Sequence, residues 1–188
     1  MDWAEIGRAV YDFLAGLLAA PPSAAGQSYT VVKPISETGY SVLAEETVIR
    51  SRLVARARNT LGIQYVWGGK DKDGRIETLP EGLDCSGEIS LVYSQESYFT
   101  KQLPHGAENQ FNFCKQEHTP LPGDLGFLKF ISEKTGALRW HVGMLTDVGT
   151  VIHASHGAGK VIEESSDKFM ARAGWIGWRS HPNFAQQA

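Results

Sequence analysis

The sequence has no run of basic residues: 18 Lys and Arg are spread among 21 Asp and Glu, and the net charge is −3. Without a cluster of positive charge it cannot neutralise a row of phosphates, so we expect no nucleic-acid partner. It also lacks a long apolar run. The stretch from Val10 to Ala20 is broken by Asp12 and is much shorter than the ~20 residues that span a bilayer. We therefore expect no integral membrane segment.

Cysteine is scarce, and Cys85 and Cys114 are too few for a disulfide framework. Two free thiols are as consistent with the sequence as one bridge, so the redox compartment stays open. A secretory leader is not evident either, because Asp2 and Glu5 occupy positions where a leader carries basic residues. The sequence therefore does not indicate an export route.

The composition, 42% hydrophobic and 21% charged, is typical of a soluble globular domain that buries its own core. Apolar residues at helical spacing over residues 3–20 predict an amphipathic helix that ends at Pro21. This helix either packs on the rest of the chain or docks on a partner or a membrane surface. We expect residues 1–28 to form this N-terminal helix and its linker, and residues 29–188 to form the main domain.

The main domain is predicted to place helices before strands. A helix from residue 45 to Gly62 carries an apolar stripe, which consists of Ile49, Leu53, Ala57 and Leu61. Another helix begins after Asp84, which suits an N-cap. Apolar and polar residues then alternate in four segments, which predicts an antiparallel meander over residues 124–130, 141–147, 150–155 and 160–164. The fold class is therefore α+β, with N-terminal helices packed on an antiparallel β-meander.

Cys85 directly follows the predicted N-cap, so it lies in the first turn of a helix. Unpaired N–H groups and the helix dipole favour an anion there, which lowers the pKa of a thiol and makes it a nucleophile. This signal is weak by itself, because most free cysteines are small buried hydrophobes. Cys114, which follows two phenylalanines in the string FNFCKQ, fits that second description. A nucleophilic cysteine also needs a base.

His141 and His153 lie on neighbouring predicted strands, across a turn at residues 147–149. Side chains alternate between faces along a strand, so the two imidazoles share a face only if the pairing keeps odd residues opposite odd ones. A three-residue loop with Gly149 in the left-handed conformation does this, whereas a two-residue loop does not. In that register one imidazole can act as the base while the other orients it. Each histidine alone is more simply a hydrogen-bonded structural residue.

Five strings occur in order along the chain: YVWGG (65–69), LDCSG (83–87), LPGDLGFL (121–128), HVGML (141–145) and VIHAS (151–155). Together they resemble the NlpC/p60 family of bacterial cell-wall cysteine peptidases over roughly residues 46–180. The resemblance implies a papain-like α+β fold, no cofactor and a peptidoglycan stem peptide or muropeptide as substrate. The bond cut is commonly that between γ-D-glutamate and a diamino acid. The implied site of action is the cell envelope, with cytoplasmic muropeptide recycling or a phage origin as alternatives.

The same resemblance implies roles for individual residues. Cys85 matches the nucleophile, His141 the general base, His153 the orienting third member and Tyr65 the hydroxyl that supports the oxyanion. Asp84 and Ser86 match residues that in some members hold the free amino terminus of the substrate. Trp67 is expected to contact the substrate as well.

The chain departs from the family pattern at three places. The loop from Lys70 to Leu83 is longer than usual, so it is expected to wall one side of the cleft. The run LPHGA has His105 and Ala107 where relatives often have arginine and serine, which removes a substrate contact. Glu88 replaces an apolar residue one helical turn after Cys85, where it would either raise the pKa of the thiol or pair with an imidazolium.

Other interpretations remain open at this level. The same Cys and His geometry would serve a related amidase or acyltransferase, and a catalytically silent wall-binding or phage-tail module is the non-enzymatic alternative. A metal site is disfavoured because no CxxC or HExxH spacing supports it, although zinc ligands are available in Cys85, Cys114, His141, His153 and His156. Three tryptophans favour packing over a glycan groove: Trp140, Trp175 and Trp178.

Overall fold

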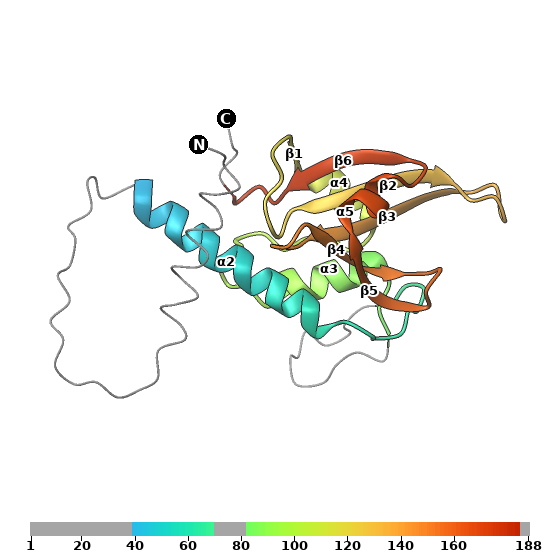
Figure 1. Cartoon of the computed structure of the whole chain (residues 1–188), viewed down its shortest axis with the longest axis horizontal. Helices are drawn as coiled ribbons and strands as arrows, with labels where there is room; N and C mark the ends of the chain where they lie inside the picture. The colour runs from blue at the N-terminus through green and yellow to red at the C-terminus, as the bar shows by residue number, and fades with distance from the viewer. Residues whose placement is uncertain (1–38, 70–81, 185–188) are drawn as a thin grey trace, which may run out of the picture. The chain divides into compact units, whose positions relative to one another are not determined.

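The computed structural model describes residues 39–69 and 82–184, with side chains in its first helix from residue 45 onward (Figure 1). The predicted N-terminal helix over residues 3–20, the linker that follows it and most of the long loop after Lys70 lie outside these residues. Within the described part, no helix is long and apolar enough to cross a membrane.

Three described helices come first, and the strands follow with one short helix between the last two. The helices are α2 (Gly39–Asn59), α3 (Cys85–Ser94), α4 (Ala107–Phe113) and α5 (Ser166–Met170). The strands are β1 (Lys115–Glu117), β2 (Leu125–Ile131), β3 (Leu138–Leu145), β4 (Thr150–Ser155), β5 (Lys160–Ser165) and β6 (Trp175–Ser180). They form one antiparallel sheet in the order β1-β6-β2-β3-β4-β5.

The α+β prediction and the meander are confirmed, since β2, β3, β4 and β5 are consecutive neighbours. Two further strands, β1 and β6, were not predicted. β1 has three residues, and the pairing of β6 with β2 shifts register between Phe127 and Leu128. Neither strand therefore leaves a long period-two pattern in the sequence.

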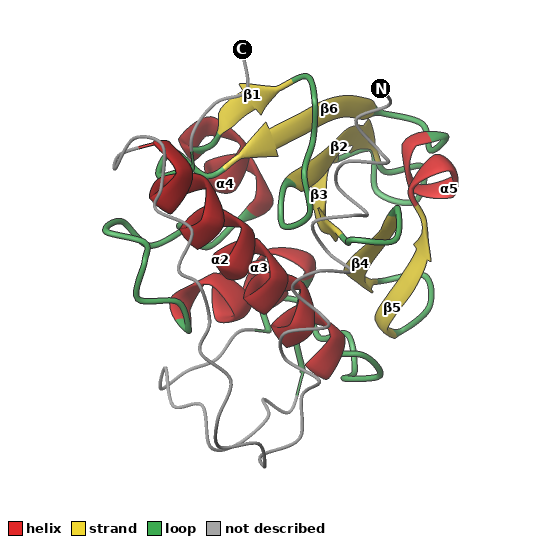
Figure 2. Ribbon diagram, turned by 60° about the vertical axis from the view of Figure 1, so that its left-hand side comes forward, coloured by secondary structure: helices red, strands yellow, loops and turns green. Residues whose placement is uncertain are grey.

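Helices α2 and α3 lie side by side against the sheet (Figure 2). The predicted stripe of α2 is buried at Ile49, Leu53 and Ala57. The prediction for Leu61 was wrong: the helix ends at Asn59, and Leu61 is 40% exposed. The helix ends early because the Thr60 hydroxyl donates to Ala57 O at 2.7 Å and closes the last turn.

The sheet buries apolar residues on both faces. Phe127, Val142 and Met144 join the main core, which also contains apolar residues of α2 and α3. A smaller cluster on the other face contains Leu128, Val151 and Phe169, against which Trp175 and Trp178 pack. Trp140 packs against the main core. The packing interpretation of the three tryptophans is therefore confirmed.

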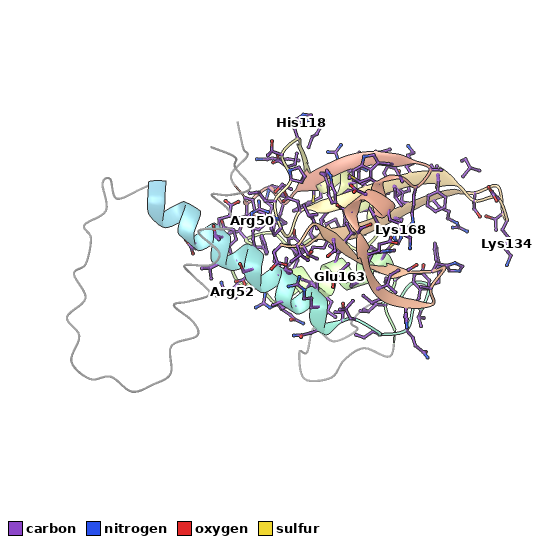
Figure 3. The ribbon with its side chains drawn as sticks, viewed as in Figure 1. Arg50, Arg52, His118, Lys134, Glu163 and Lys168 are labelled. Carbon is purple, nitrogen blue, oxygen red and sulfur yellow. The ribbon has the colours of Figure 1, made fainter. Side chains whose placement is uncertain are left out.

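A buried arginine joins α2 to the sheet. Arg50, labelled in Figure 3, donates to Asp124 Oδ1 at 2.8 Å and to Glu46 Oε1 at 2.9 Å. Its Nη1 also donates to Pro122 O at 3.0 Å. A buried charge is tolerated only when it is paired in this way, so the network fixes the position of α2 on the sheet.

Candidate active site

The β3–β4 hairpin brings two histidines together. Met144 pairs with Ile152 and Leu145 with Val151, so the loop is odd in length, and Gly149 has a φ of 72°. Nε2 of His141 consequently lies 2.8 Å from Nδ1 of His153. The predictions of an odd turn and of a shared face for the two imidazoles are confirmed.

The paired ladder of β3 and β4 ends at Met144 and Ile152, and the start of α3 contacts both strands. The backbone N–H of Val142 in β3 donates to the sulfur of Cys85. The backbone N–H of Ala154 in β4 donates to Glu88 Oε2 at 2.8 Å. The first turn of α3 thus contacts the strand that carries His141 and the strand that carries His153.

Backbone contacts between two loops set the position of Cys85. Asp84 N–H donates to Gly69 O at 2.9 Å, and Asp84 Oδ1 accepts from Gly87 N–H at 2.7 Å, which confirms Asp84 as the N-cap. A Cβ added to Gly87 would lie 2.1 Å from Gly69 O. Only glycine fits at position 87, so the glycine of the CSG string is required for the close approach of α3 to the carbonyl of residue 69.

The expected depression of the Cys85 pKa was wrong. Burial and the Asp84 carboxylate raise the pKa of this thiol to about 12, and they outweigh the N–H donors at Val142 and Ser86. Burial, reinforced by His153, lowers the pKa of His141 well below its ordinary value. At neutral pH, Cys85 is therefore a neutral thiol and His141 a neutral imidazole, so Cys85 could act as a nucleophile only if its proton were transferred as it reacted.

Tyr65 lies near enough to Cys85 for the charge of a Cys85 thiolate to affect its pKa. Burial, followed by the charges of Cys85 and Asp84, raises the pKa of Tyr65 to about 12, so its hydroxyl stays a donor. Its ring meets that of His156 edge to face, with centroids 5.2 Å apart. A cavity of about 360 Å³ opens onto His141 and His153, and Ser155, His156 and Arg172 form part of its wall.

The three residues expected to contact substrate differ in their surroundings. Asp84 Oδ1 accepts from Ser86 Oγ at 2.9 Å as well as from Gly87, and Asp84 Oδ2 accepts from Gly68 N–H at 3.1 Å. Most of the acceptor capacity of Asp84 is thus used within the chain, and Ser86 is buried. Trp67 is 70% exposed, and the guanidinium of Arg139 lies 4.9 Å from its ring centre.

Of the two effects expected of Glu88, a raised pKa of the Cys85 thiol is confirmed in direction, while no pairing with an imidazolium is found among the described residues. Glu88 is fully buried, with Thr60 Oγ1 3.2 Å from Oε1 and the Ala154 amide on Oε2, and it makes no hydrogen bond to an imidazole. Its carboxylate is only the smallest of the influences on the pKa of Cys85. Glu88 instead anchors α3 to β4.

Sequence reasoning missed Glu164, whose Oε1 lies 2.9 Å from Nε2 of His153. No motif string contains it, and only the β4–β5 pairing brings it to the histidine. Cys85 and Cys114 are both free, and within residues 39–69 and 82–184 no group of three or more His, Cys, Asp or Glu is arranged to hold a metal ion.

Comparison with known proteins adds a family match. The model of the NlpC/P60 family matches residues 62–179. Gamma-DL-glutamyl hydrolase of Bacillus subtilis (strain 168) is 31% identical over 123 residues, which make up 64% of this chain and 27% of that protein. A probable endopeptidase of Corynebacterium glutamicum (strain R) is 33% identical over 116 residues, 61% of this chain and 47% of that protein. The chain thus spans less than half the length of these two relatives.

Among solved structures, the NlpC/p60 domain of the peptidoglycan hydrolase SagA is similar at a TM-score of 0.52 and 28% identity. The match covers 70% of this chain and 97% of that domain. It agrees with the mixed helical and antiparallel architecture of the described residues.

Proposed function

The chain belongs to the NlpC/P60 family, and on that premise we propose that it is a cysteine endopeptidase that hydrolyses peptidoglycan stem peptides. The bond cleaved is that between the γ-carboxyl of D-glutamate and the amine of a diamino acid. The name of the Bacillus subtilis relative supports hydrolysis at a glutamyl bond. The observation that carries the proposal is Cys85 at a helix start, bonded to the backbone of the strand that holds His141.

In the proposed reaction, His141 takes the proton of the Cys85 thiol as the sulfur attacks the amide carbonyl carbon. The C–N bond breaks, the imidazolium of His141 gives its proton to the leaving amine, and a thioester remains. Water, deprotonated by the same imidazole, then releases the new carboxyl group and restores the thiol. The Cys85 N–H, which has no partner within its own helix, and the Tyr65 hydroxyl stabilise each oxyanion.

Substrate recognition is proposed to involve Asp84 and Trp67. One lone pair of Asp84 Oδ2 remains beside its bond from Gly68, and this position suits the ammonium of an unblocked L-alanine terminus. His105 Nε2 lies 3.6 Å from the same oxygen, so it competes for that charge when protonated. The exposed ring of Trp67 offers an apolar surface next to the loop that reaches Asp84.

The site of action that fits this substrate is the cell envelope, where peptidoglycan is accessible. Muropeptide recycling in the cytoplasm is the alternative if the free amino terminus is required, because intact murein carries muramic acid at that position. Comparing the cleavage rates of stem peptides with a free and with a blocked amino terminus distinguishes these two locations.

The test is incubation with L-Ala-γ-D-Glu-diaminopimelate and with its acetylated form, with products identified by mass spectrometry. We expect release of the diamino acid, faster from the free peptide. Cys85→Ala should lower kcat/KM by at least ~10³-fold, since no other group forms the thioester. Cys114→Ala is the matched control, because Cys114 is also free and buried but follows α4, which carries no residue of the proposed catalytic set. Wild-type rates in Cys85→Ala would end the proposal.

A further inference from the structure

A third buried polar side chain continues the line that begins at His141. Nε2 of His141 lies 2.8 Å from Nδ1 of His153, and Nε2 of His153 lies 2.9 Å from Oε1 of Glu164. The side chain of His153 is 1% exposed and that of Glu164 is 5% exposed. Water therefore has little access to the inner two members, and their polar atoms depend on partners within the protein.

The register of β4 and β5 explains the contact. His153 pairs with Ile162 and Val151 pairs with Glu164. Because side chains alternate along a strand, His153 and Glu164 project from the same face as diagonal neighbours, which are within reach of long side chains. The carboxylate is thus built into the sheet rather than carried by a loop.

The chemistry of the three groups allows one arrangement of protons. A carboxylate only accepts hydrogen bonds, so His153 must carry its proton on Nε2. Nδ1 of the neutral His153 is then an acceptor, and it takes the proton on Nε2 of His141. The remaining nitrogen of His141, Nδ1, is left with a lone pair.

We propose that Glu164 is the positioning residue that sets the direction of this hydrogen-bond chain and thereby keeps Nδ1 of His141 free to accept a proton from Cys85. The inference rests on the proposed function, in which His141 is the base. In the opposite arrangement His153 would donate from Nδ1 and His141 would carry its proton on its own Nδ1. That tautomer could not accept the thiol proton.

Two cations keep Glu164 ionised. Arg172 Nη1 contacts Oε1, and Lys168 Nζ, on α5 and labelled in Figure 3, lies 3.3 Å from Oε2. Burial alone would raise the pKa of Glu164, but Arg172, His153 and Lys168 together lower it below its ordinary value. Burial and Arg172 also lower the pKa of His153 to about 4, so His153 is neutral at neutral pH and has the two tautomers that the argument requires.

The experiment measures the tautomer directly by ¹⁵N NMR of histidine-labelled protein, with His153 assigned from the spectrum of His153→Gln. In the wild type we expect the proton of His153 on Nε2. In Glu164→Gln the side-chain amide can also donate, so a mixture of the two tautomers should form. Glu163→Gln is the matched control, because Glu163, labelled in Figure 3, precedes it on β5 and binds Thr150 instead. It should keep the wild-type tautomer.

Kinetics with the stem peptide give the second readout. Glu164→Gln should lower kcat by ~10- to 100-fold with little change in KM, whereas Glu163→Gln should change neither. A wild-type His153 protonated on Nδ1, or a Glu164→Gln protein with the wild-type tautomer, would overturn the inference. Equal losses of kcat in Glu164→Gln and Glu163→Gln would also overturn it, because they would indicate a general disturbance of β5. The NMR result needs no substrate, so it decides the inference even if the stem peptide is not cleaved.

Discussion

At Cys85 two influences on the thiol oppose each other. The start of α3 and the N–H of Val142 favour a thiolate, while burial and the carboxylate of Asp84 favour the thiol. Asp84 is also the helix cap, so the residue that orders the helix start works against ionisation of the residue next to it. The second influence is larger, because a cysteine that is 8% exposed loses most of the hydration of its charged form.

This balance predicts how Cys85 responds to pH. Because its pKa is raised to about 12, its alkylation by iodoacetamide should accelerate by about tenfold per pH unit from pH 6 to pH 10. Mass spectrometry of the modified peptide measures the rate, and Cys85→Ala gives the background from Cys114. A plateau below pH 7 would contradict the prediction, since it would indicate a preformed thiolate and imidazolium.

Among the elements, the β3–β4 hairpin depends on a single small residue, Gly143. A Cβ added to Gly143 would lie 2.5 Å from Val151 Cγ1, 3.0 Å from His153 Cβ and 3.2 Å from Ile152 O. Glycine at this position therefore lets β4 approach β3 closely enough for the two imidazoles to bond. The glycine of the HVG string is thus a requirement of strand packing.

Gly143→Ala should displace β4, lower stability by ~1–3 kcal/mol and reduce turnover, because His153 would move away from His141. Thermal unfolding and stem-peptide hydrolysis measure the two effects. The double variant Gly143→Ala/Val151→Ala removes the nearest clashing atom and should restore part of the stability and part of the turnover. Gly157→Ala is the control for stability, since the nearest atom to its added Cβ is 4.0 Å away. An unchanged melting temperature in Gly143→Ala would refute this account.

The same hairpin shows what a sequence can predict. Period-two alternation and the position of Gly149 were enough to predict that the imidazoles share a face. The contact of His153 with Glu164 was not predictable, because it depends on how β5 returns along β4. The pKa of Cys85 was also missed, since the burial that raises it comes from packing between distant segments.

For the whole described molecule, Glu88 joins three elements. It belongs to α3, its Oε2 accepts from Ala154 in β4, and its Oε1 lies 3.2 Å from Thr60 just after α2. Thr60 has one hydroxyl proton, which it shares between Glu88 and Ala57 O at 2.7 Å. A protonated Glu88 can instead donate to Thr60, so the neutral carboxyl satisfies the junction best.

Burial raises the pKa of Glu88 from 4.5 to about 8, so the folded state holds this proton more tightly than the unfolded state. Its contribution to stability is therefore complete below pH 4.5 and is lost as the pH rises to about 8. Glu88→Gln keeps a neutral group of the same shape and should escape this loss. The melting temperature of the variant should thus rise relative to the wild type between pH 5 and pH 8. We expect a difference in the free energy of unfolding of the order of a few kcal/mol.

The control for this comparison is Glu133→Gln, since Glu133 is exposed in the loop between β2 and β3 and joins no elements. It should follow the wild type at every pH. Because all other titrating groups are common to the proteins compared, the difference between Glu88→Gln and wild type isolates Glu88. If the melting temperatures of Glu88→Gln and the wild type changed in parallel from pH 5 to pH 8, the prediction would be wrong. Glu88 would then have to be ionised inside the fold, with both of its hydrogen bonds donated by Thr60 and Ala154.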